Sequence, residues 1–156
     1  KHASCDEYKS WGMNARGSLA LVLILDQFSR CVHAGKSSAF DNDLKALEQV
    51  FACIKRKRDE ELTLLERAFL YLPLMHAETE EIQEMSLQMY NRLVKLAEED
   101  ADINIEYFKY FRDLALKHYD IIKEFQRFPQ RNKLIKRKAT STEINYVLNS
   151  FELLET

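Results

Sequence analysis

The chain has 156 residues, a length that fits one domain and can bury a sizeable core without metals or disulfides. Apolar residues make up 46% and charged residues 31% of the sequence, which excludes a disordered composition. The formal net charge of -2 creates no global field that would attract nucleic acid, so we expect no nucleic-acid partner.

Helix breakers and cysteines are both few. Three glycines and two prolines are typical of long helices and not of a turn-rich β-protein. The thiols of Cys5, Cys31 and Cys53 are odd in number and lack paired spacing, which indicates a reducing compartment and predicts a cytoplasmic protein. The apolar run at residues 19–25 is much shorter than the roughly 20 residues that span a membrane. We therefore expect a core helix there and no membrane partner.

The first half of the chain begins with two predicted helices. The first covers about residues 18–33 and ends before Gly35, a residue suited to the left-handed position after a helix. Its middle is apolar on every side, so we expect it to be the central, most buried helix. The second covers about residues 42–56, where apolar residues recur at helical spacing.

Capping signals and a proline delimit the next two helices. Thr63 and Glu66 have the spacing of a capping box, which predicts the start of a third helix. Pro73 ends or kinks that helix, because proline lacks a backbone donor and clashes with the preceding turn. A fourth helix is predicted from Thr79 to about Glu99, with a single apolar stripe.

The last third of the chain contains two more predicted helices. One starts at Asp102 or Asn104 and is stopped near Phe128 by the proline that follows. After a basic linker, the capping box of Thr140 and Glu143 opens a short last helix. No strand pattern is found, and short links favour antiparallel neighbours. The sequence therefore predicts a single all-α domain of residues 1–156, with about six helices in antiparallel hairpins.

Three segments carry polar and charged residues beside apolar runs. Residues 21–30 are LVLILDQFSR, residues 66–78 are ERAFLYLPLMHAE, and residues 118–132 are HYDIIKEFQRFPQRN. Together and in this order they resemble the largely bacterial domain-of-unknown-function family 924. The resemblance implies a fold similar to tetratricopeptide helical arrays and a shared residue set, but no established reaction. The family usually has more sequence before the first block, which favours an N-terminal truncation here.

The chain departs from the family pattern at four positions. Ser29 and Cys31 stand where the family tends to have Pro and Asn, so neither is expected to be a nucleophile. Gln126 and Gln130 stand where it tends to have Gly and His. A role that requires a small residue at Gln126 or an imidazole at Gln130 is therefore not carried over.

Asp26 and Arg30 are candidate site residues on the first predicted helix. They are four residues apart, so their side chains share a helix face. They follow an apolar run where burial is expected, and a buried charge must find a partner. Two interpretations stay open: an internal ion pair between helices, or a cavity in which Arg30 meets an anionic ligand. Gln27 would be a polar accessory to either.

Two histidines and two carboxylates invite a metal hypothesis, namely His76 with Glu78 and His118 with Asp120. Residues two apart on a helix point about 200° apart, so His118 and Asp120 cannot share one ion. We expect no metal site. A hydrogen bond from His76 or His118 to some carboxylate is favoured, and it would be structural or would tune a general base.

Arg127, Arg131 and Asn132 flank Pro129 at a predicted helix end. Guanidinium groups bind carboxylate or phosphate through paired donors, which points to an anion site. The alternative is a lock, in which the arginines donate to exposed backbone carbonyls and fix the linker. The sequence contains no Gly-rich phosphate loop, nucleophile elbow or dinucleotide fingerprint, so no cofactor is expected.

The leading functional hypothesis is a helical binding domain with a polar pocket for a small anion or an acidic peptide. An alternative is a hydrolase-type enzyme that uses His76 or His118 as acid or base. A third is a scaffold protein without a pocket, in which the same residues are internal locks. The candidate ligand-binding residues are Asp26, Gln27, Arg30, His76, Glu78, His118, Asp120, Arg127, Arg131 and Asn132.

Overall fold

The computed structural model describes residues 8–100 and 103–152. Within these residues every regular element is a helix and no strand is present, which confirms the all-α fold class. The α-helices are α1 (Ala15–Val22), α2 (Ser29–Val32), α3 (Asp43–Lys55), α4 (Leu64–Leu70), α5 (Leu72–His76), α6 (Glu80–Glu98), α7 (Ile105–Phe125) and α8 (Ser141–Glu152). Short 3-10 turns lie at Lys9–Met13, Ser37–Phe40, Arg58–Glu61 and Pro129–Arg131.

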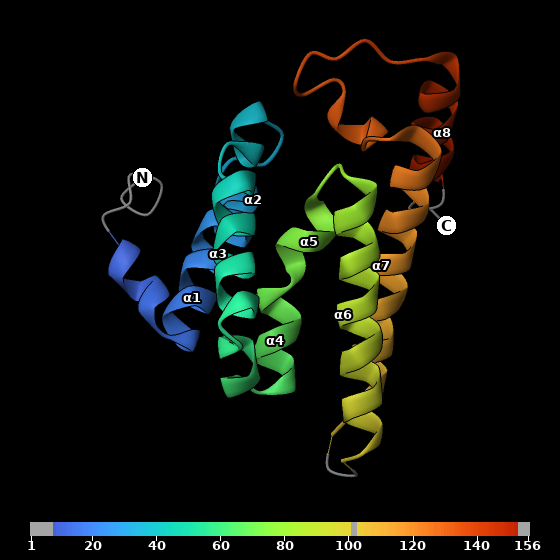
Figure 1. Cartoon of the computed structure of the whole chain (residues 1–156). Coiled ribbons are helices and arrows are strands. Elements are labelled where there is room, and N and C mark those ends of the chain that lie inside the picture. The colour runs from blue at the N-terminus through green and yellow to red at the C-terminus, as the bar shows by residue number, and fades with distance from the viewer. Residues whose placement is uncertain (1–7, 101–102, 153–156) are drawn as a thin grey trace.

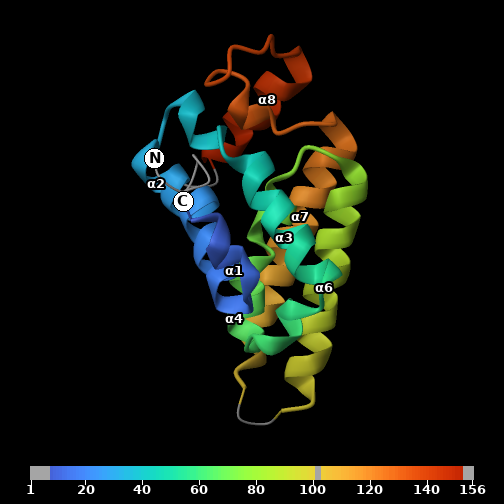
Figure 2. The same ribbon diagram turned by 60° about the vertical axis from the view of Figure 1, so that its left-hand side comes forward.

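The helices form three groups across the molecule (Figure 1). Helices α1, α2 and α3 lie on one side, α4 and α5 lie in the middle, and the antiparallel pair α6 and α7 forms the other side. Helix α8 lies beyond the C-terminal end of α7, and the turned view places the first group in front of the α6–α7 pair (Figure 2). Because α5 contacts both α3 and α6, it connects the two outer groups.

The first predicted helix is present as one helical path that changes its winding midway. Helix α1 passes into a π-helical turn at Leu23–Phe28, and α2 then continues to Val32. Gly35 follows with a φ of 74°, the left-handed conformation expected of a glycine after a helix end. Such π turns are rare and often occur at functional sites. This one contains Asp26.

The expectation that residues 18–33 form the most buried helix is wrong. Phe28 and Val32 are 60% and 73% exposed, because α1 and α2 lie at the edge of the molecule. The deepest segment is instead residues 70–75, all of which are buried between α3 and α6. Hydrophobicity on all sides of a helix does not by itself place it at the centre of the fold.

The two predicted capping boxes are present in the structure, whereas the side chain of Thr79 makes no capping hydrogen bond before α6. The side chain of Thr63 accepts from the backbone N–H of Glu66 while the Glu66 carboxylate accepts from the N–H of Thr63. Thr140 and Glu143 make the same reciprocal pair before α8. Both boxes satisfy backbone donors that a helix start leaves without intrahelical partners.

Other helix ends differ from the predictions in detail. Asn104 caps α7 by accepting from the N–H of Glu106, whereas Asp102 lies outside the described residues. Pro73 lies in the first turn of α5, where its missing N–H removes no hydrogen bond, so the break comes just before it at Tyr71. No helix within the described residues is both long enough and apolar enough to cross a membrane.

The C-terminal end of α7 generates a test of backbone strain. The helix ends at Phe125, and Gln126 then adopts a φ of 58°, in the left-handed region that disfavours residues with a Cβ. Gln126→Gly should therefore raise the free energy of unfolding by about 1 kcal/mol. Urea unfolding of the variant checks this.

The control is Lys123→Gly, within α7, where glycine should destabilise by about 1 kcal/mol because the helical backbone there needs no positive φ. If both glycine variants lose stability to the same extent, the left-handed conformation at Gln126 is not strained.

Candidate functional site

The centre of the candidate site is the carboxylate of Asp26, which is completely buried. It accepts hydrogen bonds from Gln27 Nε2 at 2.5 Å, from Arg30 Nε at 3.0 Å and from His76 Nδ1 at 2.7 Å. Burial alone would raise the pKa of Asp26, but the hydrogen bond and charge of His76 and the charge of Arg30 outweigh it and lower the pKa. Asp26 is therefore a buried anion that its donors keep ionised.

The helical path explains how Asp26 meets its partners. Asp26 and Gln27 lie in the π turn, and Arg30 follows one turn later on the same face. His76 is the last residue of α5, which lies in the middle of the molecule between α3 and α6. The first and second sequence blocks are thus brought together by the pairing of one acid with one imidazole.

Arg30 extends the cluster to α3. Its Nη2 donates to Oδ1 of Asp43 at 2.9 Å, while its Nε is held by Asp26. The guanidinium carbon of Arg30 also lies 5.4 Å from the ring centroid of Phe40. Arg30 is therefore held between two carboxylates and an aromatic face, with 20% of its side chain exposed.

Arg131 brings the third sequence block to the same place. Its Nη2 donates to the backbone oxygen of His76 at 2.9 Å, and its Nη1 lies 3.4 Å from Oδ2 of Asp43. The guanidinium lies 4.7 Å from the ring centroid of Phe40 and 4.5 Å from that of Phe128. Burial, followed by the charge of Arg30, lowers the pKa of Arg131 to about 10, so it remains a cation at neutral pH.

His118 lies beside this cluster without joining its ion pairs. Its ring centroid is 6.1 Å from that of His76 and 5.3 Å from that of Phe128. Burial, followed by the charge of His76, lowers the pKa of His118 to about 4. His118 is therefore neutral at physiological pH, whereas His76 has the carboxylate partner.

Glu78 belongs to a neighbouring group that includes a residue the sequence did not single out. Arg137 donates from Nη1 and Nη2 to both Glu78 oxygens, at 2.5 and 2.8 Å, and from Nε to Oδ1 of Asn132 at 2.9 Å. Glu78 also accepts from the backbone N–H of Phe128 at 2.8 Å. These contacts join the α5–α6 junction to the segment after α7, so Glu78 and Asn132 are separate from the Asp26 cluster.

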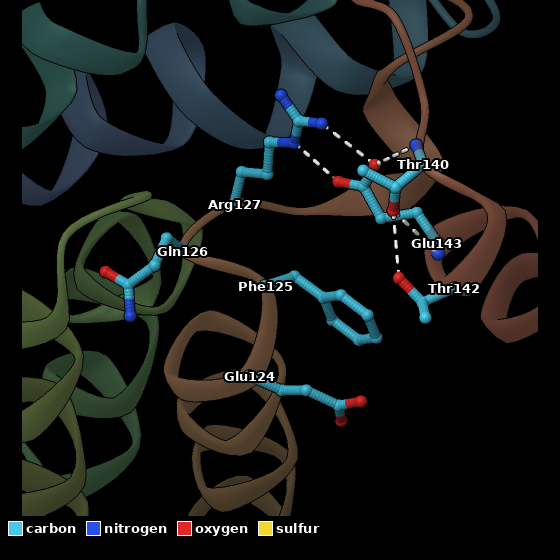
Figure 3. Close-up of a pocket in the computed structure, with 7 residues that line it drawn as sticks. All are labelled: Glu124, Phe125, Gln126, Arg127, Thr140, Thr142 and Glu143. Atoms are coloured by element: carbon cyan, nitrogen blue, oxygen red, sulfur yellow. Dashed lines mark hydrogen bonds and ion pairs between the residues drawn. The ribbon is translucent and has the colours of Figure 1, made fainter.

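Arg127 forms a third group at the start of α8. Its Nε and Nη2 donate to the two oxygens of Glu143 at 2.5 and 2.8 Å, and Nη2 also donates to the backbone oxygen of Lys138. The hydrogen bond from Arg127, followed by that from the Thr140 N–H, lowers the pKa of Glu143. This pair lines a pocket of about 490 Å3. Figure 3 shows the Phe125 ring among the side chains that line it.

Asp120 lies outside all three groups. Its side chain is exposed on α7, and within the described residues it makes no hydrogen bond or ion pair. Among the described residues no three His, Cys, Asp or Glu side chains are grouped so that they could hold a metal ion. The candidate residues that converge on one place are Asp26, Gln27, Arg30, His76 and Arg131, with His118 adjacent.

Sequence reasoning missed three members of these groups. Phe40 lies between the first two predicted helices, and Asp43 lies at the start of the second. Both are outside the three blocks, and no spacing ties them to Arg30 or Arg131. Arg137 lies in the basic linker before the last predicted helix. Its partner Glu78 is 59 residues away, so no local spacing indicates the pair.

The buried position of Asp26 generates a test of stability. Asp26→Ala removes the acceptor shared by Arg30 and His76 and should lower the free energy of unfolding by about 3–5 kcal/mol. Arg30→Ala should cost less, because Asp26 keeps His76 and Gln27 as donors. Urea unfolding of both variants measures these losses.

The matched control is Arg92→Ala, which breaks an ion pair with Glu60 whose side chains are 55% and 45% exposed. Its loss should stay below about 1 kcal/mol. An Asp26→Ala loss as small as that of the control would contradict the buried-anion account.

His118 generates a test of pH dependence. Its pKa is about 4 in the fold and 6.5 ordinarily, so protonation favours the unfolded chain. The stability that neutral His118 contributes is complete above about pH 6.5 and is lost as the pH falls towards about 4, by at most about 3 kcal/mol. In His118→Gln, thermal unfolding between pH 7 and 4.5 should show a shallower loss than in the parent protein. If the two proteins lose stability in parallel over this pH range, the account of a buried, neutral His118 is contradicted.

Comparisons with known proteins agree with the resemblance drawn from the three sequence blocks. Residues 1–150 match the family model described as "Bacterial protein of unknown function (DUF924)". The solved structure of a protein of unknown function from Agrobacterium tumefaciens is similar, with 30% sequence identity and a TM-score of 0.81. The match covers 94% of this chain and 75% of that one. No curated protein matches the chain.

Proposed function

The chain belongs to the DUF924 family of bacterial proteins of unknown function, and we propose that it is a binding domain for a small anion. The observation that carries the proposal is the meeting of two guanidinium groups, from Arg30 and Arg131, beside the imidazole of His76. These side chains come from three segments far apart in the sequence. Two like charges held close together need an anion between them, and the Asp43 carboxylate takes that position in this structure.

The geometry favours a small ligand over an acidic peptide. The side chains of Arg30, His76 and Arg131 are 20%, 17% and 12% exposed, so only a small part of each meets solvent. A partly buried site of this kind strengthens charge-assisted hydrogen bonds relative to an open surface patch. A single carboxylate, phosphate or sulfate group fits this description better than an extended chain does.

A second candidate function, acid–base catalysis, is favoured by the Asp26–His76 contact. A carboxylate that accepts from Nδ1 fixes the tautomer and orientation of the imidazole, which leaves Nε2 available for a proton. Within the described residues Nε2 of His76 makes no hydrogen bond. His76 suits this role better than His118, whose pKa is lowered to about 4 by burial. The two candidate functions share one site and differ in whether the bound molecule is changed.

The test of the proposal is calorimetric titration with formate, succinate, phosphate and sulfate. An anion that binds the cluster should also stabilise the fold, by about 2.7 kcal/mol at a hundredfold excess over its dissociation constant. Arg131→Lys should weaken binding, because lysine lacks the planar fork of donors. Lys138→Ala, an exposed residue of the same basic stretch, is the control and should change little.

Binding that survives Arg131→Lys unchanged would place the anion elsewhere. If no anion binds the parent protein at millimolar concentration, the cluster is an internal lock and the protein is better described as a scaffold. The catalytic candidate adds a further readout: His76→Gln should abolish turnover of a bound substrate while its binding persists.

A further inference from the structure

Asp43 holds an unusual position for a structural residue, because its carboxylate spans the two arginines of the proposed anion site. Oδ1 accepts from Arg30 Nη2 at 2.9 Å, and Oδ2 faces Arg131 Nη1 at 3.4 Å. A carboxylate with each oxygen directed at a different guanidinium is the arrangement by which a bound carboxylic acid would be held.

The two guanidinium groups are positioned independently of Asp43. Both lie over the ring of Phe40, and Arg131 is also stacked on Phe128. Arg30 is anchored to Asp26 through Nε, and Arg131 to the backbone oxygen of His76 through Nη2. Removal of the Asp43 carboxylate would therefore leave two aligned cations in place.

The hydrogen bonding between Asp43 and the two arginines is incomplete. The 3.4 Å contact to Arg131 is at the long limit for a hydrogen bond. Within the described residues Arg30 Nη1 and Arg131 Nε donate to no acceptor, so each arginine keeps an unused N–H donor. Burial raises the pKa of Asp43, and the charges of Arg30 and Arg131 do not fully offset it. A free carboxylate, which no backbone constrains, can satisfy both arginines better than this side chain does.

We infer that the ligand of this site is a carboxylate, and that its carboxylate group takes the position which the Asp43 side chain occupies between Arg30 and Arg131 in the free protein. The inference rests on the proposed anion-binding function and adds the chemical class of the ligand. Asp43 is 23% exposed in its side chain, so an incoming carboxylate can reach the same two guanidinium groups from solvent. Asp43 would then compete with the ligand and set its affinity.

The test compares the parent protein with Asp43→Ala by calorimetric titration of formate, acetate, succinate, phosphate and sulfate. Asp43→Ala should bind formate and acetate about tenfold or more tightly than the parent, because the internal competitor is gone. The same carboxylates should restore its melting temperature towards that of the parent. Asp43→Asn, which keeps the shape of the side chain, provides the same comparison if Asp43→Ala does not fold.

Two controls test whether the gain in carboxylate affinity arises at this site. Asp41→Ala, on an exposed acid two residues away, should leave every affinity unchanged. Asp43→Ala combined with Arg131→Gln should lose the gain, since one of the two guanidinium groups is missing.

The outcomes separate this inference from the proposed function. Anion binding by the parent without tighter carboxylate binding by either Asp43 variant would overturn the inference and leave the proposed function standing. A gain for phosphate or sulfate that exceeds the gain for carboxylates would overturn the assigned ligand class. A gain seen only in the variants, with no binding by the parent, would support the position of the carboxylate and contradict the proposed function.

Discussion

The burial of the Asp26 carboxylate is the constraint on which the arrangement of the site depends. Removing an ionised carboxylate from water costs several kcal/mol, and this cost is offset only when donors surround it with good geometry. Here one donor comes from the same π turn, one from the next turn of the helical path, and one from the end of α5. Asp26 thereby fixes the position of α5 relative to the first helix group.

The remaining contacts extend outward from this anion. Arg30 donates hydrogen bonds both to Asp26 and to Asp43 on α3. The other Asp43 oxygen faces Arg131 in the segment after α7. Arg137 and Arg127 hold the same segment through Glu78 and Glu143. An alternation of acids and arginines therefore links the helix groups to the C-terminal part of the described chain. It also leaves two guanidinium groups of one cluster close to solvent.

The helices could be predicted because the signals that mark them lie within a few residues of each other in the sequence. The apolar stripe of α6 and the capping pairs at Thr63 and Thr140 depend on residues within a turn of each other, so spacing alone reveals them. The π turn at Asp26 could not be predicted from the sequence. A helix that is apolar on every side has no periodic apolar stripe, and a π turn can be detected only as a shift in such a stripe. The absence of an apolar stripe also led to the wrong prediction of which helix is central.

The site was only partly predictable, for a related reason. Polar residues beside apolar runs pointed to Asp26, Arg30, His76 and Arg131, since a buried charge needs a partner. The partners of His76 and Arg131 are decided by contacts between residues 50 or more apart, namely His76 with Asp26 and Arg131 with the His76 carbonyl. Asp43 was missed because nothing in its neighbourhood marks it.

A crystal structure of the protein grown in the presence of acetate or succinate tests the central claim most directly. The account predicts electron density for a carboxylate between Arg30 and Arg131, with the Asp43 side chain displaced towards solvent and the Asp26–His76 hydrogen bond intact. An unchanged Asp43 between the two arginines, with the carboxylate absent or bound elsewhere on the molecule, would contradict it.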